Sequence, residues 1–106
     1  MKEASPKTPD TKAIRLTARE YQVALKNLEI VLQSLHRVGS FYADDKATCD
    51  QETIKALDDF KCVQRLSMVR TQLWEAVRRE LGHEDVEALE EMMGQVRHWA
   101  PKKEPS

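Results

Sequence analysis

Glycine and aromatic residues are scarce in this sequence. Its 106 residues include 3 glycines, and phenylalanine, tyrosine and tryptophan together make up 6% of the chain. Short runs of β-branched residues bounded by turn residues, the usual mark of strands, are also rare. The chain therefore has few positions for the tight turns that join neighbouring strands. We predict an all-α fold.

The sequence also lacks the features of secreted and membrane-spanning proteins. No apolar run approaches the roughly 20 residues that span a bilayer, and the N-terminus has no signal-peptide core. The two cysteines, Cys49 and Cys62, stand in no CxxC or CxxH frame. Together these observations predict a cytoplasmic protein with free thiols and no membrane contact. A Cys49–Cys62 disulfide is the alternative.

No excess of one charge and no catalytic motif is present. The 17 basic and 18 acidic residues leave a net charge of −1, which gives no general attraction to nucleic acid or an anionic membrane. His36, His83 and His98 have no metal-ligand spacing, and there is no phosphate-binding glycine loop, nucleophile elbow or HExxH. We expect neither an enzyme nor a cofactor or metal site.

Proline and serine cluster at the two ends, in "MKEASPKTPDTK" and "PKKEPS". Neither end has apolar periodicity, so we predict flexible tails over residues 1–16 and 101–106. A single helical domain is expected over residues 17–100. Roughly 85 residues are few for an independent core, and oligomerisation is a common remedy at that size.

The first helix is predicted over residues 17–42. It opens with a capping box, Thr17 followed three residues later by Glu20. Apolar residues then recur at alternating spacings of three and four, a heptad pattern that is typical of helix-on-helix packing. The members of this pattern are Tyr21, Ala24, Leu28, Val31, Leu35, Val38 and Tyr42.

A long second helix is predicted over residues 51–81, after the polar connection "ADDKATCD". Thr48 or Asp50 can cap its start. Gly82 stands just past its end, where a left-handed closing residue is expected. A shorter third helix, residues 84–99, ends before Pro101. The predicted architecture is a helical bundle of two long antiparallel helices and a short third one.

The first helix has more apolar residues than one face can hold. Its core stripe is predicted to contain Leu25, Leu28, Val31, Leu32 and Leu35. Val23, Ile30 and Phe41 lie about 140° to 160° away from Leu28 around the helix axis. The third helix would span only about 24 Å, against about 46 Å for the second, and cannot cover both long helices. We therefore predict a homodimer, or a monomer that awaits another protein. The alternative is that the third helix, or a curve of the bundle, covers every apolar residue.

Two further groups of residues are candidates for an interface. Arg70 lies near the apolar stripe of the second helix, four residues before Trp74, and this pair is frequent in interface hot spots. Alternatively, the stem of Arg70 packs while its charge reaches water. Met92, Met93 and Trp99 form either an adaptable binding ridge or plain core. The candidate partner-binding or dimer-interface residues are Val23, Ile30, Phe41, Tyr42, Arg70, Trp74, Met92, Met93 and Trp99.

The segment "RRELGHEDVEALEEMM" has the outline of a DNA-binding helix-turn-helix. Its second helix is acidic, however, and phosphates would repel it. We therefore expect no direct nucleic-acid binding by this element.

In size and layout the chain resembles the small helical anti-activators of bacterial quorum sensing, the TraM and QslA type, and especially QslA. The similarity covers a polar N-terminal tail, the helix "TAREYQVALKNLEIVLQSLHRVGSFY", the loop "ADDKATCDQ" and the helix "TIKALDDFKCVQRLSMVRTQLWEAVRRELG". The extra helix "EDVEALEEMMGQVRHW" departs from the two-helix TraM pattern.

The resemblance implies a protein that binds a LuxR-type (LasR-like) transcription activator. Such a protein would cover the activator's dimerisation surface and so prevent it from holding a two-fold DNA site. Two alternatives stay open. One is a helical adaptor, a chaperone or a phage-type inhibitor of another bacterial protein. The other is a nucleic-acid accessory protein that uses Arg65, Arg70, Arg78 and Arg79, which the near-neutral charge disfavours.

Overall fold

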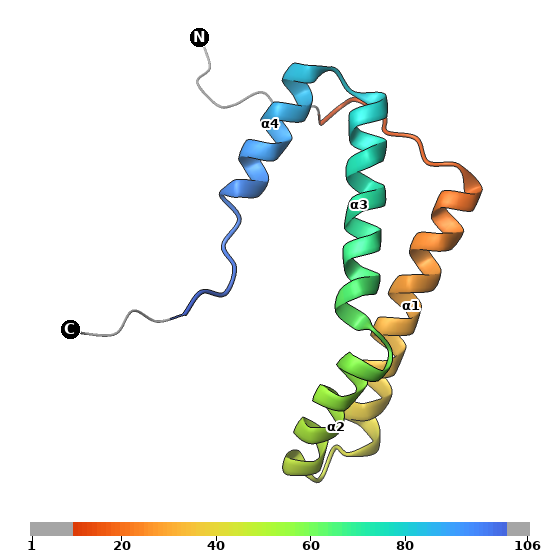
Figure 1. Cartoon of the computed structure of the whole chain (residues 1–106), viewed down its shortest axis with the longest axis vertical. Helices are drawn as coiled ribbons and strands as arrows, with labels where there is room; N and C mark the ends of the chain where they lie inside the picture. The colour runs from red at the N-terminus through yellow and green to blue at the C-terminus, as the bar shows by residue number, and fades with distance from the viewer. Residues whose placement is uncertain (1–9, 102–106) are drawn as a thin grey trace, which may run out of the picture.

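The computed structural model describes residues 10–101, and this part of the chain contains four helices and no strand (Figure 1). The helices are α1 (Ala18–Phe41), α2 (Lys46–Asp59), α3 (Cys62–Glu80) and α4 (His83–Gly94). The predicted all-α class is confirmed. The predicted number of helices is wrong, because the expected single helix over residues 51–81 is divided into α2 and α3.

α1 begins at the predicted capping box. The Thr17 hydroxyl accepts a hydrogen bond from the backbone N–H of Glu20 at 3.1 Å, and the Glu20 carboxylate accepts one from the N–H of Thr17 at 2.7 Å. Two of the four N–H groups that a helix start leaves unpaired are thereby satisfied. The Glu20 carboxylate also lies 3.1 Å from the guanidinium of Arg79 in the last turn of α3. The start of α1 is therefore tied to the end of α3.

α2 begins earlier than the sequence suggested. Its cap is Asp45, in place of the predicted Thr48 or Asp50. The Asp45 carboxylate accepts hydrogen bonds from the backbone N–H of Thr48 at 3.1 Å and from the Thr48 hydroxyl at 2.7 Å. Thr48 thus contributes as a donor to the cap. Much of the segment that was predicted to be a loop is consequently the first turn of α2.

The chain bends between α2 and α3 at Phe60 and Lys61. Lys61 has φ 54° and ψ 44°, and it is the single non-glycine residue with positive φ within residues 10–101. The carbonyl of Phe60, which the bend removes from a regular helix, accepts a hydrogen bond from Nε of Arg65 at 2.8 Å. Arg65 also donates from Nη1 to Oδ1 of Asn27 in α1, at 2.9 Å. The prediction of an unbroken helix failed because a residue distant in the sequence helps to stabilise the break.

The third predicted helix is shorter than expected. α4 ends at Gly94, and residues 96–101 have no regular structure, so Trp99 lies outside the helix. Glycine disfavours helix, and Val96 and Trp99 are exposed, so no packing offsets that preference. Gly82 is also different from its prediction, because it caps the start of α4 with φ −74°, outside the left-handed region.

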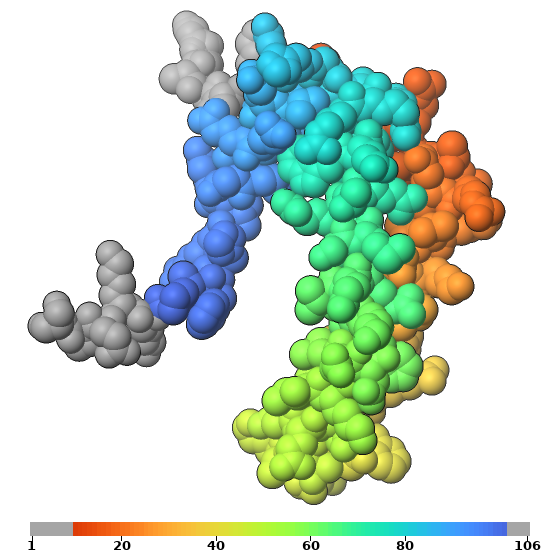
Figure 2. Space-filling model, in the orientation of Figure 1, coloured from red at the N-terminus to blue at the C-terminus, as the bar shows by residue number. Residues whose placement is uncertain are grey.

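The helices form an open arrangement. α1 packs along both α2 and α3, whereas α4 contacts α3 alone among the helices of residues 10–101. In Figure 2, α4 and the residues after it leave the lower half of α3 uncovered on that side. The Cα radius of gyration is 18.6 Å, compared with about 13 Å for a compact domain of this length.

Mainly small side chains fill the space between the helices. No side chain larger than that of Cys62 is fully buried within the described residues. Small residues allow two helices to approach closely, but they bury little apolar area. The larger leucines therefore lie to the sides of this contact. The buried apolar residues are Ala24, Val31, Ala56, Cys62, Val69, Ala76 and Leu81.

Part of the predicted N-terminal tail is in contact with the helices. Lys12 forms an ion pair with Asp85, and Arg15 lies 3.1 Å from Glu80. The carbonyl of Arg15 accepts a hydrogen bond from Arg79 at 2.6 Å. These contacts tie residues 12–15 to the ends of α3 and α4. The remainder of the predicted tails, residues 1–9 and 102–106, lies outside the described part of the chain.

Candidate protein-binding faces

α1 and α3 run in opposite directions, and three contacts fix their alignment. Near the start of α1, the carbonyl of Glu20 accepts a hydrogen bond from Nε2 of Gln72 at 3.0 Å, while its carboxylate pairs with Arg79. Further along α1, Asn27 meets Arg65. As residue numbers rise in α1, the partners in α3 fall. The predicted antiparallel pairing of two long helices is therefore present in α1 and α3.

Large apolar side chains lie on one side of this pair. On each helix they are rotated by about 70° to 80°, in the same sense, from the line of small buried residues. Because the two helices are antiparallel, equal rotations of the same sense bring both stripes to the same side of the pair. We call this surface the open face. Its members are Tyr21, Leu25, Leu28 and Leu32 of α1 and Val63, Leu66 and Leu73 of α3.

The sequence pattern predicted that leucines of the open face would be buried in the core. Leu25 and Leu32 are 54% and 59% exposed, although both were predicted to be buried. Leu66 and Leu73 of α3 are 45% and 47% exposed. The periodicity of α1 identified the correct side only approximately, because Ala24, Asn27 and Val31 occupy the contact with α3. Only the position of the neighbouring helix shows which part of an apolar stripe is covered.

Two predicted interface residues of α1 lie away from the open face. Val23 lines a shallow groove with Met68 and Gln72 of α3. Ile30 is half-buried beside Phe60 at the α2–α3 bend. These residues are on the opposite side of the α1–α3 pair.

Phe41 and Tyr42 lie at the far end of α1. The side chain of Phe41 is 80% exposed, and its ring meets that of Tyr42 edge-on with 4.9 Å between the centroids. Tyr42 is half-buried where α1 ends. This aromatic pair is distant from Trp74, so the predicted residues do not form a single surface.

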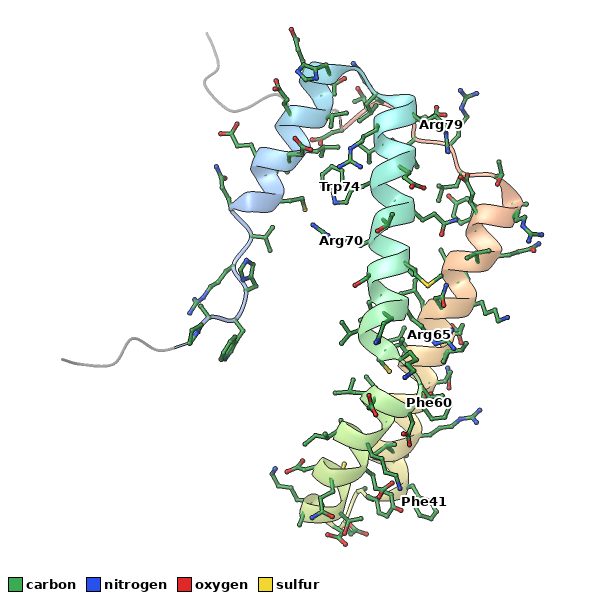
Figure 3. All side chains as sticks on the ribbon, viewed as in Figure 1. Phe41, Phe60, Arg65, Arg70, Trp74 and Arg79 are labelled. Carbon is green, nitrogen blue, oxygen red and sulfur yellow. The ribbon has the colours of Figure 1, made fainter. Side chains whose placement is uncertain are left out.

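A groove between α3 and α4 unites another part of the predicted set. Its volume is about 380 Å³, and it contains Arg70, Trp74 and Met93. Arg70 and Trp74 project from α3 toward the side on which α4 lies (Figure 3). Of the other two predicted residues, Met92 is half-buried and Trp99 is 83% exposed, and neither lines this groove. The apolar residues that complete the groove are Leu66, Val69, Leu73, Val77 and Leu89.

Arg78 links the outer edge of the groove to α4. Its guanidinium carbon lies 5.6 Å from the centre of the Trp74 ring, in a cation–π contact. The same guanidinium lies 3.9 Å from the Glu90 carboxylate. Both partners are partly exposed, so we expect this ion pair to contribute little to stability.

The four arginines of the nucleic-acid alternative do not share one surface within residues 10–101. Arg65 donates hydrogen bonds to Asn27 and Phe60, Arg78 forms an ion pair with Glu90, and Arg79 forms ion pairs with Glu20 and Glu80. Their positions are also spread around the axis of α3. Electrostatic binding to a phosphate backbone needs a concentrated basic patch, which this distribution does not provide.

Hydrogen bonds and ion pairs where the start of α1 meets the end of α3 lower the pKa values of two carboxylates. The pKa of Glu20 is lowered from its ordinary value of 4.5 by the Thr17 N–H and by the Arg79 guanidinium. The pKa of Glu80 is lowered chiefly by its hydrogen bond from Arg15, with a further contribution from Arg79. Both carboxylates are therefore held in their charged form.

No group of three or more histidine, cysteine, aspartate or glutamate side chains is placed to hold a metal ion within residues 10–101. The thiols of Cys49 and Cys62 are both free, and that of Cys62 is buried. None of the described helices combines the length and apolar character needed to cross a membrane.

Comparisons of the chain with protein-family models, curated proteins and solved structures find no match.

Proposed function

We propose that this chain is a protein-binding regulator that acts through the open face. One observation carries the proposal: four leucines are about half exposed on the same side of the antiparallel helix pair, Leu25 and Leu32 of α1 and Leu66 and Leu73 of α3. Contiguous apolar patches of more than a few hundred Å² are rare on monomeric proteins and usually mark an interaction site. Apolar helix surface with no concave polar centre is suited to binding a protein rather than to catalysis.

In isolation, the proposed occupant of the open face is a second copy of the chain. The α1–α3 pair is a single layer of helices, and helical domains are stable when two layers bury their apolar faces against each other. Two such layers related by a two-fold axis would form a four-helix arrangement. The members of the open face carry no charge, so like-charge repulsion does not oppose this contact.

In the cell, the proposed partner is a LuxR-type (LasR-like) transcription activator in the cytoplasm. This assignment rests on the resemblance in size and layout to quorum-sensing anti-activators. The open face would cover the apolar surface through which the activator dimerises. To succeed, it must bind that surface more favourably than a second activator subunit does. Binding of the activator and homodimerisation through the same face exclude each other.

The experiment compares two glutamate substitutions on α3. Leu66→Glu places a charge on the open face, while Met68→Glu places one on the opposite side of the helix. Both native side chains are about half exposed, at 45% and 55%. The two substitutions should therefore lower the free energy of unfolding by similar amounts. Sedimentation over a wide concentration range, followed by capture of a purified LuxR-type ligand-binding domain, gives the two readouts.

We expect Leu66→Glu to yield a folded monomer that loses capture of the activator domain by at least tenfold, while Met68→Glu behaves like the wild type. If the two variants behaved equally, the proposal that the chain binds through the open face would be overturned. If Leu66→Glu abolished the dimer but the wild type did not capture the activator domain, the open face would stand as a dimer interface and the activator would be ruled out as its partner.

A further inference from the structure

Two arginines of α3, Arg70 and Arg78, lie along the edge of the α3–α4 groove, with Trp74 midway between them. The eight residues from one arginine to the other correspond to about 12 Å along the helix axis. Each arginine follows a valine that lines the groove, Val69 or Val77. The groove therefore offers two positions at which a positive charge stands beside apolar surface.

α4 occupies the position at Arg78. This helix is rich in acidic residues. Its Leu89 side chain lines the groove, and the carboxylate of the next residue, Glu90, lies 3.9 Å from the guanidinium of Arg78. An apolar side chain and a neighbouring carboxylate of α4 thus meet apolar surface and a guanidinium of α3. The contact at Arg78 shows which kind of helix this side of α3 accepts.

The position at Arg70 is not covered in the same way. Figure 1 shows that α4 diverges from α3 toward its end at Gly94, which leaves the lower half of α3 uncovered on that side. Arg70 is exposed and forms no hydrogen bond or ion pair within residues 10–101. Leu66 and Leu73, which line the groove before and after Arg70, are 45% and 47% exposed. Here the groove combines an uncompensated positive charge with exposed apolar side chains.

We propose that this part of the groove binds an amphipathic helix of a partner protein that presents a carboxylate to Arg70. A guanidinium and a carboxylate can form two parallel hydrogen bonds, and apolar surroundings strengthen them. The groove extends along α3 from Leu66 to Val77, which is about 16 Å or three turns of helix. A helix of that length places apolar anchors at positions i, i+4 and i+7.

The partner helix would make with Arg70 the contact that Glu90 makes with Arg78. This charge-selective site goes beyond the proposed function, because its wall on α4 lies outside the open face. It also does not depend on the identity of the activator.

The fluorescence of Trp74 reports occupancy of the groove. The chain has two tryptophans, and Trp99→Phe removes the other one, which does not line the groove. The probe is a synthetic helical peptide of about 16 residues, with leucine at positions i, i+4 and i+7 and glutamate beside each leucine. In its twin, glutamine replaces every glutamate. Neither peptide contains an aromatic residue, so a change in emission comes from Trp74.

We expect the glutamate peptide to shift the emission saturably and to bind about fivefold more tightly than the glutamine peptide. Arg70→Gln should make the two affinities equal. Arg37→Gln is the control, because Arg37 is also exposed and forms no hydrogen bond or ion pair within the described residues, but lies on α1 outside this groove. Equal binding of the two peptides to the Arg70 protein, or a preference that survives Arg70→Gln, would overturn the proposal.

A second pair of substitutions separates the groove from the open face. Met93→Glu adds a charge to the α4 wall of the groove, and Leu25→Glu adds one to the α1 part of the open face. The native side chains are similarly exposed, at 49% and 54%. Met93→Glu should weaken binding of the glutamate peptide at least tenfold, and Leu25→Glu should leave it unchanged.

Loss of peptide binding in Leu25→Glu alone would place the peptide on the open face and contradict the groove. An emission shift that rises with protein concentration in the absence of peptide, and that Met93→Glu abolishes, would identify a second copy as the occupant and overturn the proposal. Dimerisation and capture of the activator through the open face are measured separately, so a failure of the groove is distinguishable from a failure of the proposed function.

Discussion

Arg65 connects three segments that are far apart in the sequence. Its guanidinium bonds to the carbonyl of Phe60 at the bend and to the side chain of Asn27 in α1. Asn27 is buried, at 6% exposure, and its side-chain amide donates a hydrogen bond to the carbonyl of Val23 at 3.0 Å. Buried polar groups are costly unless they are paired. Arg65 therefore holds the α2–α3 bend against α1.

Replacing Arg65 by methionine should lower the free energy of unfolding by about 1.5–3 kcal/mol, because it leaves the amide of Asn27 and the carbonyl of Phe60 without their charged donor. Urea titration measures the change. The control is Arg70→Met, since no hydrogen bond or ion pair of Arg70 is present within the described residues; it should change the free energy of unfolding by less than about 0.5 kcal/mol. Equal losses would mean that the bend is stabilised by other contacts.

The lowered pKa of Glu20 predicts a dependence of stability on pH. The pKa in the folded state is below the ordinary value of 4.5, so the unfolded chain takes up the proton first on acidification. The stabilisation by Glu20 is therefore complete above pH 4.5 and is lost as the pH falls through the folded-state pKa. Glu80, with its lowered pKa, should add to the same loss.

We expect the thermal midpoint to fall between about pH 5 and pH 3, and to fall less in Glu20→Gln than in the wild type. Glu29→Gln is the control, because within residues 10–101 its carboxylate accepts only a long hydrogen bond of 3.5 Å, from Gln33. If the wild type and Glu20→Gln lost stability in parallel, the capping box and the Arg79 contact would not account for the acid sensitivity.

At the scale of the helices, small residues determine how α1 and α3 meet. Ala24 of α1 and Ala76 of α3 are buried, at 6% and 1% exposure, while large leucines flank the contact. The axes can approach closely because little side-chain volume lies between them. The same choice leaves little apolar area to stabilise a monomer, which is consistent with an exposed face that a further layer of helices could cover.

Enlarging the buried alanine should separate the helices. Ala76→Leu is expected to destabilise the protein by about 1–3 kcal/mol, because a well-packed contact cannot accommodate the extra volume without backbone shifts. Thr71→Leu, at an exposed position of the same helix, is the control and should have a much smaller effect. Denaturant unfolding gives both values, and an unaffected Ala76→Leu variant would show that the contact is looser than its burial indicates.

At the scale of the whole molecule, the open face and the α3–α4 groove share Leu66 and Leu73. A second copy of the chain and a partner protein would therefore compete for the same side chains. Each would cover apolar surface that the α1–α3 pair leaves exposed.

Several features of the fold could be read from the sequence because they depend on local interactions. The capping box of Thr17 and Glu20 involves residues three apart, and the start of α1 was predicted correctly. The helical class followed from periodicity and from the scarcity of turn residues. The sequence also singled out Arg70, Trp74 and Met93, which the structure brings to one groove.

Other features could not be read because distant residues decide them. Lys61 has none of the conformational preference for left-handed backbone that glycine or asparagine has, so nothing local marks the bend. Leu25 and Leu32 belong to an apolar stripe whose centre is set by the position of α3. The end of α4 at Gly94 depends on whether Val96 and Trp99 find packing, which no periodicity can establish.

The sequence by itself therefore determined a near-neutral, all-α chain with a capped first helix and more apolar surface than one short third helix could cover. Hydrogen bonds between near neighbours and the 3.6-residue period of the helix are sufficient for those conclusions. Only the tertiary structure decided where the long helix bends and which apolar residues are exposed. Both depend on contacts between helices, such as that of Arg65 with Asn27 and that of Gln72 with Glu20, whose partners lie tens of residues away in the chain.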